Sequence, residues 1–122
     1  KEFVEDELTK NPDIAAMVGL FEYNPPIILD VLRERGDLGK VKIVGFDENP
    51  NTLQAIKDGE IHGTVVQDPY NYGYQSIKVL HALANGDDSV IPKSKFIDIP
   101  ARQIRKENVD VFWKDLNSKL GK

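Results

Sequence analysis

Residues with the potential for chemistry stand where apolar stretches of the sequence end. The stretch VKIVG runs directly into Phe46 and Asp47, and a later apolar stretch ends on Gln67. An earlier one is followed by Phe21 and Tyr23. A carboxylate accepts hydrogen bonds from neighbouring hydroxyls, a carboxamide donates and accepts them, and an aromatic ring covers the apolar C–H side of a sugar. These five residues are therefore candidates for a carbohydrate site.

Each candidate also has a purely structural interpretation. An aspartate after a strand is common as a turn residue or a helix cap, and Asp47 stands shortly before a helix start at Asn49-Pro50. Phe21 and Tyr23 fit a loop that covers the core. Asn24 is best explained as a helix cap. From the pattern alone, both interpretations of Asp47 and of the two aromatic residues stay open.

Strands and helices are predicted to alternate along the chain, and these elements must position the candidates. Apolar runs predict strands over residues 14–20, 41–46, 61–66 and 96–99. Helical periodicity and start or stop residues predict helices over 2–10, from 24–25 to 35, from 50 to Gly59, over 70–85, and after Asn108. The order strand–helix, three times in succession, predicts an α/β fold with a parallel sheet flanked by helices.

This topology brings the candidates to one place, because ligands bind at the carboxyl ends of parallel strands in open α/β sheets. The last two helices are expected to carry clear apolar faces. These faces comprise Tyr74, Ile77, Leu80 and Leu83 in one helix, and Val111, Phe112, Leu116 and Leu120 in the other.

The composition and the absence of known motifs argue against several classes of function. The 122 residues carry a net charge of -4 with acids and bases mixed, which argues against a nucleic-acid surface. Cysteine is absent, and His62 and His81 have no partner at metal-ligand spacing, so no metal site is predicted. There is no phosphate loop, no serine elbow and no cofactor motif. The sequence predicts no catalytic residue, no cofactor and hence no enzyme.

Several short motifs, in the same order and at similar spacing, resemble the C-terminal half of the type I periplasmic sugar-binding proteins of ABC transporters, of the ribose-binding type. The motifs are Asn11-Pro12-Asp13-Ile14, Val44-Gly45-Phe46-Asp47, Ile56-Lys57-Asp58-Gly59 and Thr64-Val65-Val66-Gln67-Asp68-Pro69. The resemblance implies one flavodoxin-like lobe of a two-lobed protein that holds a sugar in the cleft between its lobes.

The resemblance also assigns roles to individual residues. It implies that Asp47 binds sugar hydroxyls, that Phe46 lies beside the sugar, and that Gln67 stands at the hinge. Phe21 occupies the position of an asparagine that is common in the family. This departure implies a sugar other than ribose, or a stacking contact in place of a hydrogen bond.

The resemblance further implies that residues 1–122 form a single partial α/β unit. Residues 1–69 would be strand–helix units of the second lobe, residues 70–95 a helix that returns to the first lobe, and residues 96–122 the last strand and helix. The expected partners are a sugar, a membrane permease, and either the missing first lobe or a second copy. The expected location is periplasmic, or extracellular with a lipid anchor. A ligand-sensing domain of a sugar-responsive transcriptional regulator or sensor is the alternative.

Overall fold

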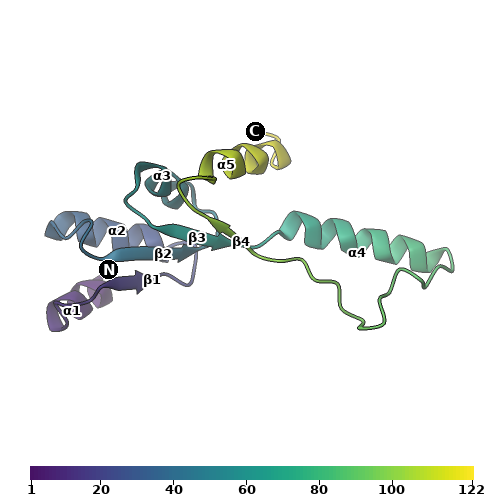
Figure 1. The fold of residues 1–122 in the computed structure, drawn as a ribbon, viewed down its shortest axis with the longest axis horizontal. Coiled ribbons are helices and arrows are strands. Elements are labelled where there is room, and N and C mark those ends of the chain that lie inside the picture. The colour runs from purple at the N-terminus through teal and green to yellow at the C-terminus, as the bar shows by residue number, and fades with distance from the viewer. The chain divides into compact units, whose positions relative to one another are not determined.

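The computed structural model describes residues 1–122 and divides them into two compact units. The first unit comprises Lys1–Val66 and Arg102–Lys122, and the second comprises Gln67–Ala101. The first unit contains α1 (Glu2–Lys10), β1 (Ala16–Val18), α2 (Asn24–Arg35), β2 (Lys42–Phe46), α3 (Pro50–Asp58), β3 (Gly63–Val66), β4 (Arg102–Ile104) and α5 (Val109–Lys119) (Figure 1). The second unit contains α4 (Pro69–Ala84).

The strands form one four-stranded sheet in the order β1-β2-β3-β4. Strands β1, β2 and β3 run parallel, with Val44 paired to Val18 on one side and to Gly63 on the other. Strand β4 joins β3 in the antiparallel sense, with Arg102 opposite Val66. The predicted α/β fold with a parallel sheet is confirmed, and one antiparallel strand is added at its edge.

Local signals in the sequence set the ends of α2 and α3. Each helix ends at a glycine in the left-handed conformation, Gly36 with φ 71° and Gly59 with φ 86°. Helix α3 begins at Pro50, directly after Asn49, whose side chain accepts a hydrogen bond from the Asn51 amide. The helix limits predicted at these positions are confirmed.

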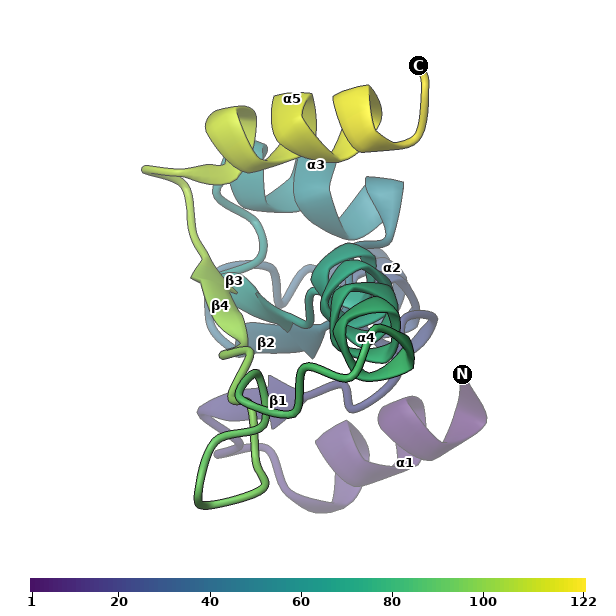
Figure 2. The same cartoon turned by 90° about the vertical axis from the view of Figure 1, so that its right-hand side faces the viewer.

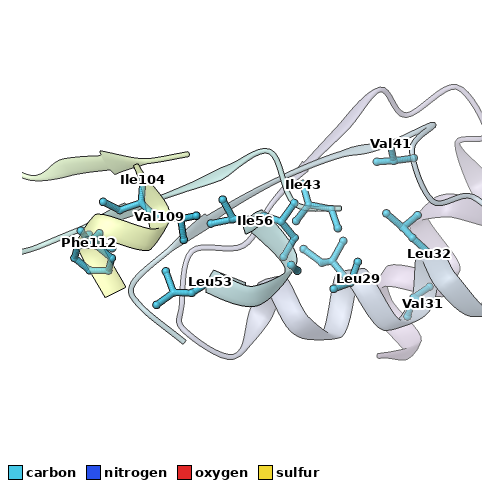
Figure 3. Packing of buried hydrophobic residues seen from close by; sticks show 14 of the residues in the cluster. Leu29, Val31, Leu32, Val41, Ile43, Leu53, Ile56, Ile104, Val109 and Phe112 are labelled. Carbon is cyan, nitrogen blue, oxygen red and sulfur yellow. The ribbon is translucent and has the colours of Figure 1, made fainter. Parts of the chain in front are cut away.

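The hydrophobic core lies between the sheet and the helices of the first unit. Helices α1, α2 and α3 lie to one side of the strands in Figure 2, and α5 packs against α3. Ile43 of β2, Ile56 of α3 and Leu29 of α2 are buried and lie close together in Figure 3. Truncating a residue of this kind typically costs about 2–5 kcal/mol, so these contacts contribute strongly to the stability of the first unit.

The first predicted strand is shorter and more exposed than expected. Strand β1 covers only Ala16–Val18, and Val18 and Leu20 keep 56% and 63% of their surface exposed. A strand is confirmed within residues 14–20, but the predicted extent and burial are wrong: β1 has 3 residues and is an edge strand that pairs with β2 alone.

The strand predicted over residues 96–99 is also wrong. That stretch has no regular structure, and the strand of this region is β4, a few residues later. Arg105 and Lys106 are exposed, but Arg102 belongs to β4 and places its guanidinium carbon 5.2 Å from the centre of the Phe112 ring.

Helix α5 presents a different face to the core than predicted. Phe112 is buried and Leu116 is partly buried, as expected, but Val111 is 74% exposed and Leu120 is 57% exposed. Val109 is fully buried instead. The buried face therefore follows positions i, i+3 and i+7 from Val109, which is the period of an α-helix.

Helix α4 has no buried residue. The side chains expected to form its apolar face all keep more than a third of their surface exposed, and we call them the α4 apolar face: Tyr74, Ile77, Leu80 and Leu83. None of the helices combines the length and the hydrophobicity that crossing a membrane requires.

Candidate functional site

The candidate residues follow the carboxyl ends of the three parallel strands, which point the same way in Figure 1. Phe46 is the last residue of β2, and Asp47 follows it. Phe21 and Tyr23 lie in the loop between β1 and α2. Gln67 directly follows β3 as the first residue of the second unit, and its side chain is exposed. The first unit therefore brings β2 and the β1–α2 loop to one edge of its sheet.

Asp47 adopts a left-handed backbone conformation, with φ 68°. Aspartate and asparagine tolerate this region better than most other residues with a side chain. The Asp47 amide donates to the Val65 carbonyl at 2.9 Å, and the Asp47 carbonyl accepts from the Thr64 hydroxyl at 2.8 Å. The helix-cap interpretation of Asp47 is wrong, because Asn49 caps α3.

Two glycines let the start of α2 approach the ends of β1 and β2. A Cβ atom on Gly45 would lie 2.7 Å from Cγ of Pro25, and one on Gly19 would lie 2.8 Å from Cδ of the same proline. Pro25 is buried. Only glycine fits at these two strand ends, and this close packing places the β1–α2 loop.

The β1–α2 loop displays two stacked aromatic rings. The ring centres of Phe21 and Tyr23 are 5.9 Å apart and the rings are nearly parallel, at 7°. Both side chains are about 60% exposed, so they do not cover the core. Asn24 is not the N-cap of α2, since the helix begins at Asn24 itself. Its side-chain oxygen accepts from the Phe21 amide at 3.0 Å and braces the loop.

Negative charge accumulates beside Asp47. Asn49 donates a hydrogen bond to Glu22 at 3.1 Å, which ties the β1–α2 loop to the segment after β2. Burial raises the pKa of the Glu48 carboxyl, and the charges of Asp47 and Glu22 raise it further. No group of three or more acidic, histidine or cysteine side chains is arranged to hold a metal ion.

The end of β2 provides an acceptor for hydroxyl hydrogen bonds, Asp47, directly after an aromatic residue in the sequence, Phe46. The Asp47 carboxylate stands on a backbone fixed at both of its peptide groups, and Phe46 is only partly buried. Sequence reasoning missed Thr64, which fixes one of those groups. Its signal was a hydroxyl residue in a strand that is otherwise glycine and valine.

Comparisons with known proteins agree with the fold and with the sequence motifs. A family model described as the periplasmic binding protein domain matches residues 1–88. The ribose import binding protein of Salmonella typhimurium is 33% identical over 86 residues, which cover 69% of this chain and 28% of that protein. The D-galactose/methyl-galactoside binding periplasmic protein of Haemophilus influenzae is 32% identical over 80 residues, which cover 62% of this chain and 24% of that protein. The chain therefore spans less than a third of the length of these relatives.

Solved structures give the same picture. The glucose-galactose binding protein from Geobacillus stearothermophilus matches with a TM-score of 0.75 and 30% identity, over 88% of this chain and 37% of that one. An ABC transporter solute binding protein from Agrobacterium vitis, solved with bound D-fucose, matches with a TM-score of 0.73 and 28% identity, over 89% of this chain and 36% of that one.

Proposed function

Since this chain belongs to the periplasmic binding protein domain family, as its motifs predicted, we propose that it is part of a protein that binds a sugar without chemically changing it. In this proposal the complete protein holds the sugar in a cleft between two lobes and delivers it to the permease of an ABC transporter. The proposed location is the periplasm, which is the location printed for the Haemophilus relative.

The observation that carries the proposal is the fixed placement of Asp47 at the end of β2. Its amide and carbonyl are both bonded to β3, which fixes the backbone that carries the carboxylate, and a carboxylate accepts hydrogen bonds from sugar hydroxyls. Phe46 would lie against the apolar side of the sugar ring. The printed names of the relatives, which bind ribose, galactosides or D-fucose, support a sugar as the ligand.

The remaining candidates are given supporting roles. Phe21 and Tyr23 expose parallel rings suited to stacking on a sugar, which would replace the hydrogen bond of the asparagine common in the family. Gln67 would contribute an amide that donates and accepts hydrogen bonds. We also propose that the α4 apolar face contacts the rest of the complete protein, because the matched segment covers only 28% of the length of the Salmonella ribose import binding protein.

The test uses the complete protein that contains this sequence. Its thermal unfolding is measured with D-ribose, D-xylose, L-arabinose, D-galactose, D-glucose and D-fucose in turn. A bound sugar at about a hundred times its Kd stabilises the folded state by about 2.7 kcal/mol, which is a readily measured rise in Tm. We expect at least one sugar to produce this rise.

Two variants locate the site. Asp47→Asn should abolish most of the rise in Tm, since the amide cannot replace a carboxylate as a double acceptor. Asp13→Asn is the matched control, because Asp13 is an exposed aspartate before β1, at the opposite end of the strands. An unchanged response of Asp47→Asn would remove Asp47 from the site. The absence of a response to every sugar would refute the proposed function.

A further inference from the structure

Asp47 is hydrogen-bonded to a buried residue of β3 that a ligand cannot reach. We propose that Thr64 is a positioning residue: its hydroxyl fixes the backbone of Asp47 and thereby sets the affinity for the sugar. Thr64 is 2% exposed, and its hydroxyl donates to the Asp47 carbonyl at 2.8 Å. The inference rests on the proposed function, because it concerns the same site.

The geometry explains why one hydroxyl has this effect. The φ and ψ angles of Asp47 relate the peptide groups on either side of its Cα atom. They set the direction of the Cα–Cβ bond and limit the rotamers that the side chain can adopt. The preceding group is fixed through the Asp47 amide, which donates to the Val65 carbonyl. The following group is fixed through the Asp47 carbonyl, which accepts from Thr64. Both anchors lie in β3, so the neighbouring strand holds the backbone conformation from which the carboxylate extends.

The conformation that is fixed in this way is one that the chain does not favour by itself. A residue with a side chain is disfavoured at the φ of 68° that Asp47 adopts, so the conformation persists only when its surroundings hold it. Without the Thr64 hydroxyl, the following peptide group loses this anchor. The carboxylate then samples several directions, and ordering it again lowers the affinity for a sugar.

The neighbouring strand leaves room for this hydroxyl. Gly45 pairs directly with Thr64, and a Cβ atom built on Gly45 would lie 3.3 Å from the Thr64 hydroxyl oxygen. A larger residue in place of Gly45 would crowd the hydroxyl that bonds to Asp47. The glycine before Phe46 therefore serves the position of Asp47 as well as the packing of Pro25.

The experiment measures the Kd of the complete protein for the sugars named above by calorimetry. Thr64→Val keeps the shape of the side chain and removes the donor, whereas Thr64→Ser keeps the hydroxyl. We expect Thr64→Val to raise the Kd about tenfold, which corresponds to the loss of one hydrogen bond, and Thr64→Ser to restore nearly all of the affinity.

Thr52→Val is the matched control. Thr52 is also fully buried, but its hydroxyl has no hydrogen-bond partner, so its replacement should leave the Kd unchanged. A Kd of Thr64→Val equal to that of the wild type overturns the inference and leaves the proposed function intact. An equal loss of affinity in Thr64→Val and Thr64→Ser also overturns it, because the hydroxyl is then not responsible. A wild-type protein that binds none of the sugars refutes the proposed function, and the inference fails with it.

Discussion

At the scale of single residues, Asp47 combines two requirements that few side chains meet together. Its backbone is left-handed, which favours glycine, asparagine and aspartate, and its proposed role needs a carboxylate. Aspartate meets both, since glutamate tolerates this conformation less well. The residue type at this position is therefore determined by backbone geometry as well as by ligand chemistry.

Stability measurements can separate these two requirements. We expect Asp47→Ala to destabilise the protein by about 1–2 kcal/mol, because alanine is strained at this φ. Asp47→Asn and Asp47→Gly should each cost less, since both residues accept the conformation. Urea unfolding without sugar measures the difference. Equal losses for alanine and glycine would show that the left-handed backbone is not retained in solution.

Glu48 makes stability depend on pH. Burial, assisted by the charges of Asp47 and Glu22, raises the pKa of its carboxyl in the folded state. The folded state therefore holds the Glu48 proton more tightly than the unfolded state does. The contribution of Glu48 to the free energy of unfolding is highest below the ordinary carboxyl pKa, and it declines as the pH rises through the raised value.

Glu48→Gln should remove this decline. We expect the variant to be more stable than the wild type at neutral pH, by less than about 1 kcal/mol because water screens a partly exposed carboxyl. Urea unfolding between about pH 4 and about pH 8 provides the measurement, and this range spans the ordinary carboxyl values. Glu107→Gln, which removes an exposed carboxylate, is the control. Parallel pH curves for Glu48→Gln and the wild type would contradict the prediction.

At the scale of elements, the start of α2 packs closely against the ends of β1 and β2. Gly45→Ala would place a methyl group 2.7 Å from Cγ of the buried Pro25. We expect a loss of about 1–3 kcal/mol, as in other overpacked cores, and a displaced β1–α2 loop. Gly73→Ala in α4 is the control, since a Cβ atom there meets nothing within 4 Å and alanine favours a helix. Chemical denaturation of both variants checks the contrast.

Local signals predicted most of these elements. The limits of α2 and α3 were predicted almost to the residue from proline and asparagine at helix starts and glycine at helix ends. The three parallel strands were predicted from the alternation of strands and helices along the chain. The strand over residues 96–99 failed because alternating polarity is a local pattern, whereas strand pairing depends on distant partners. The true strand, Arg-Gln-Ile, carries almost no signal of its own.

The candidate site was predictable to the same degree. Positions that directly follow a strand, such as Asp47, could be found from the sequence, because chain order places them at one edge of the sheet. The bond from Thr64 to Asp47 could not, since it joins neighbouring strands and depends on an unusual φ. The structure was also needed to show that Asn49, and not Asp47, caps α3.

At the scale of the whole molecule, the α4 apolar face is the exposed apolar surface of the second unit. Ile77 and Leu80 keep 67% and 60% of their surface exposed. Exposed apolar surface of this kind favours association. We proposed that the rest of the complete protein covers this face. A charge placed on it should therefore have different effects in the isolated chain and in the complete protein.

Ile77→Glu should reduce self-association in the isolated chain and reduce stability in the complete protein. In the isolated 122-residue chain it should reduce self-association, measured by sedimentation velocity. In the complete protein it should lower the free energy of unfolding by about 1–3 kcal/mol, because the charge would be placed in a contact. Lys78→Glu, the adjacent exposed position, is the control and should do neither. A complete protein that tolerates Ile77→Glu without loss would show that the face is not covered.

The pairing of Val66 with Arg102 allows the segment between them to be replaced by protein engineering. The two residues face each other on adjacent strands, so everything from residue 67 to residue 101 departs from and comes back to a single point of the sheet. In topological terms, β3 and β4 are a hairpin whose turn has been expanded into a helix and its return path. A short Asn-Gly turn could close that hairpin directly, and the remaining sheet would keep every strand pair it has now.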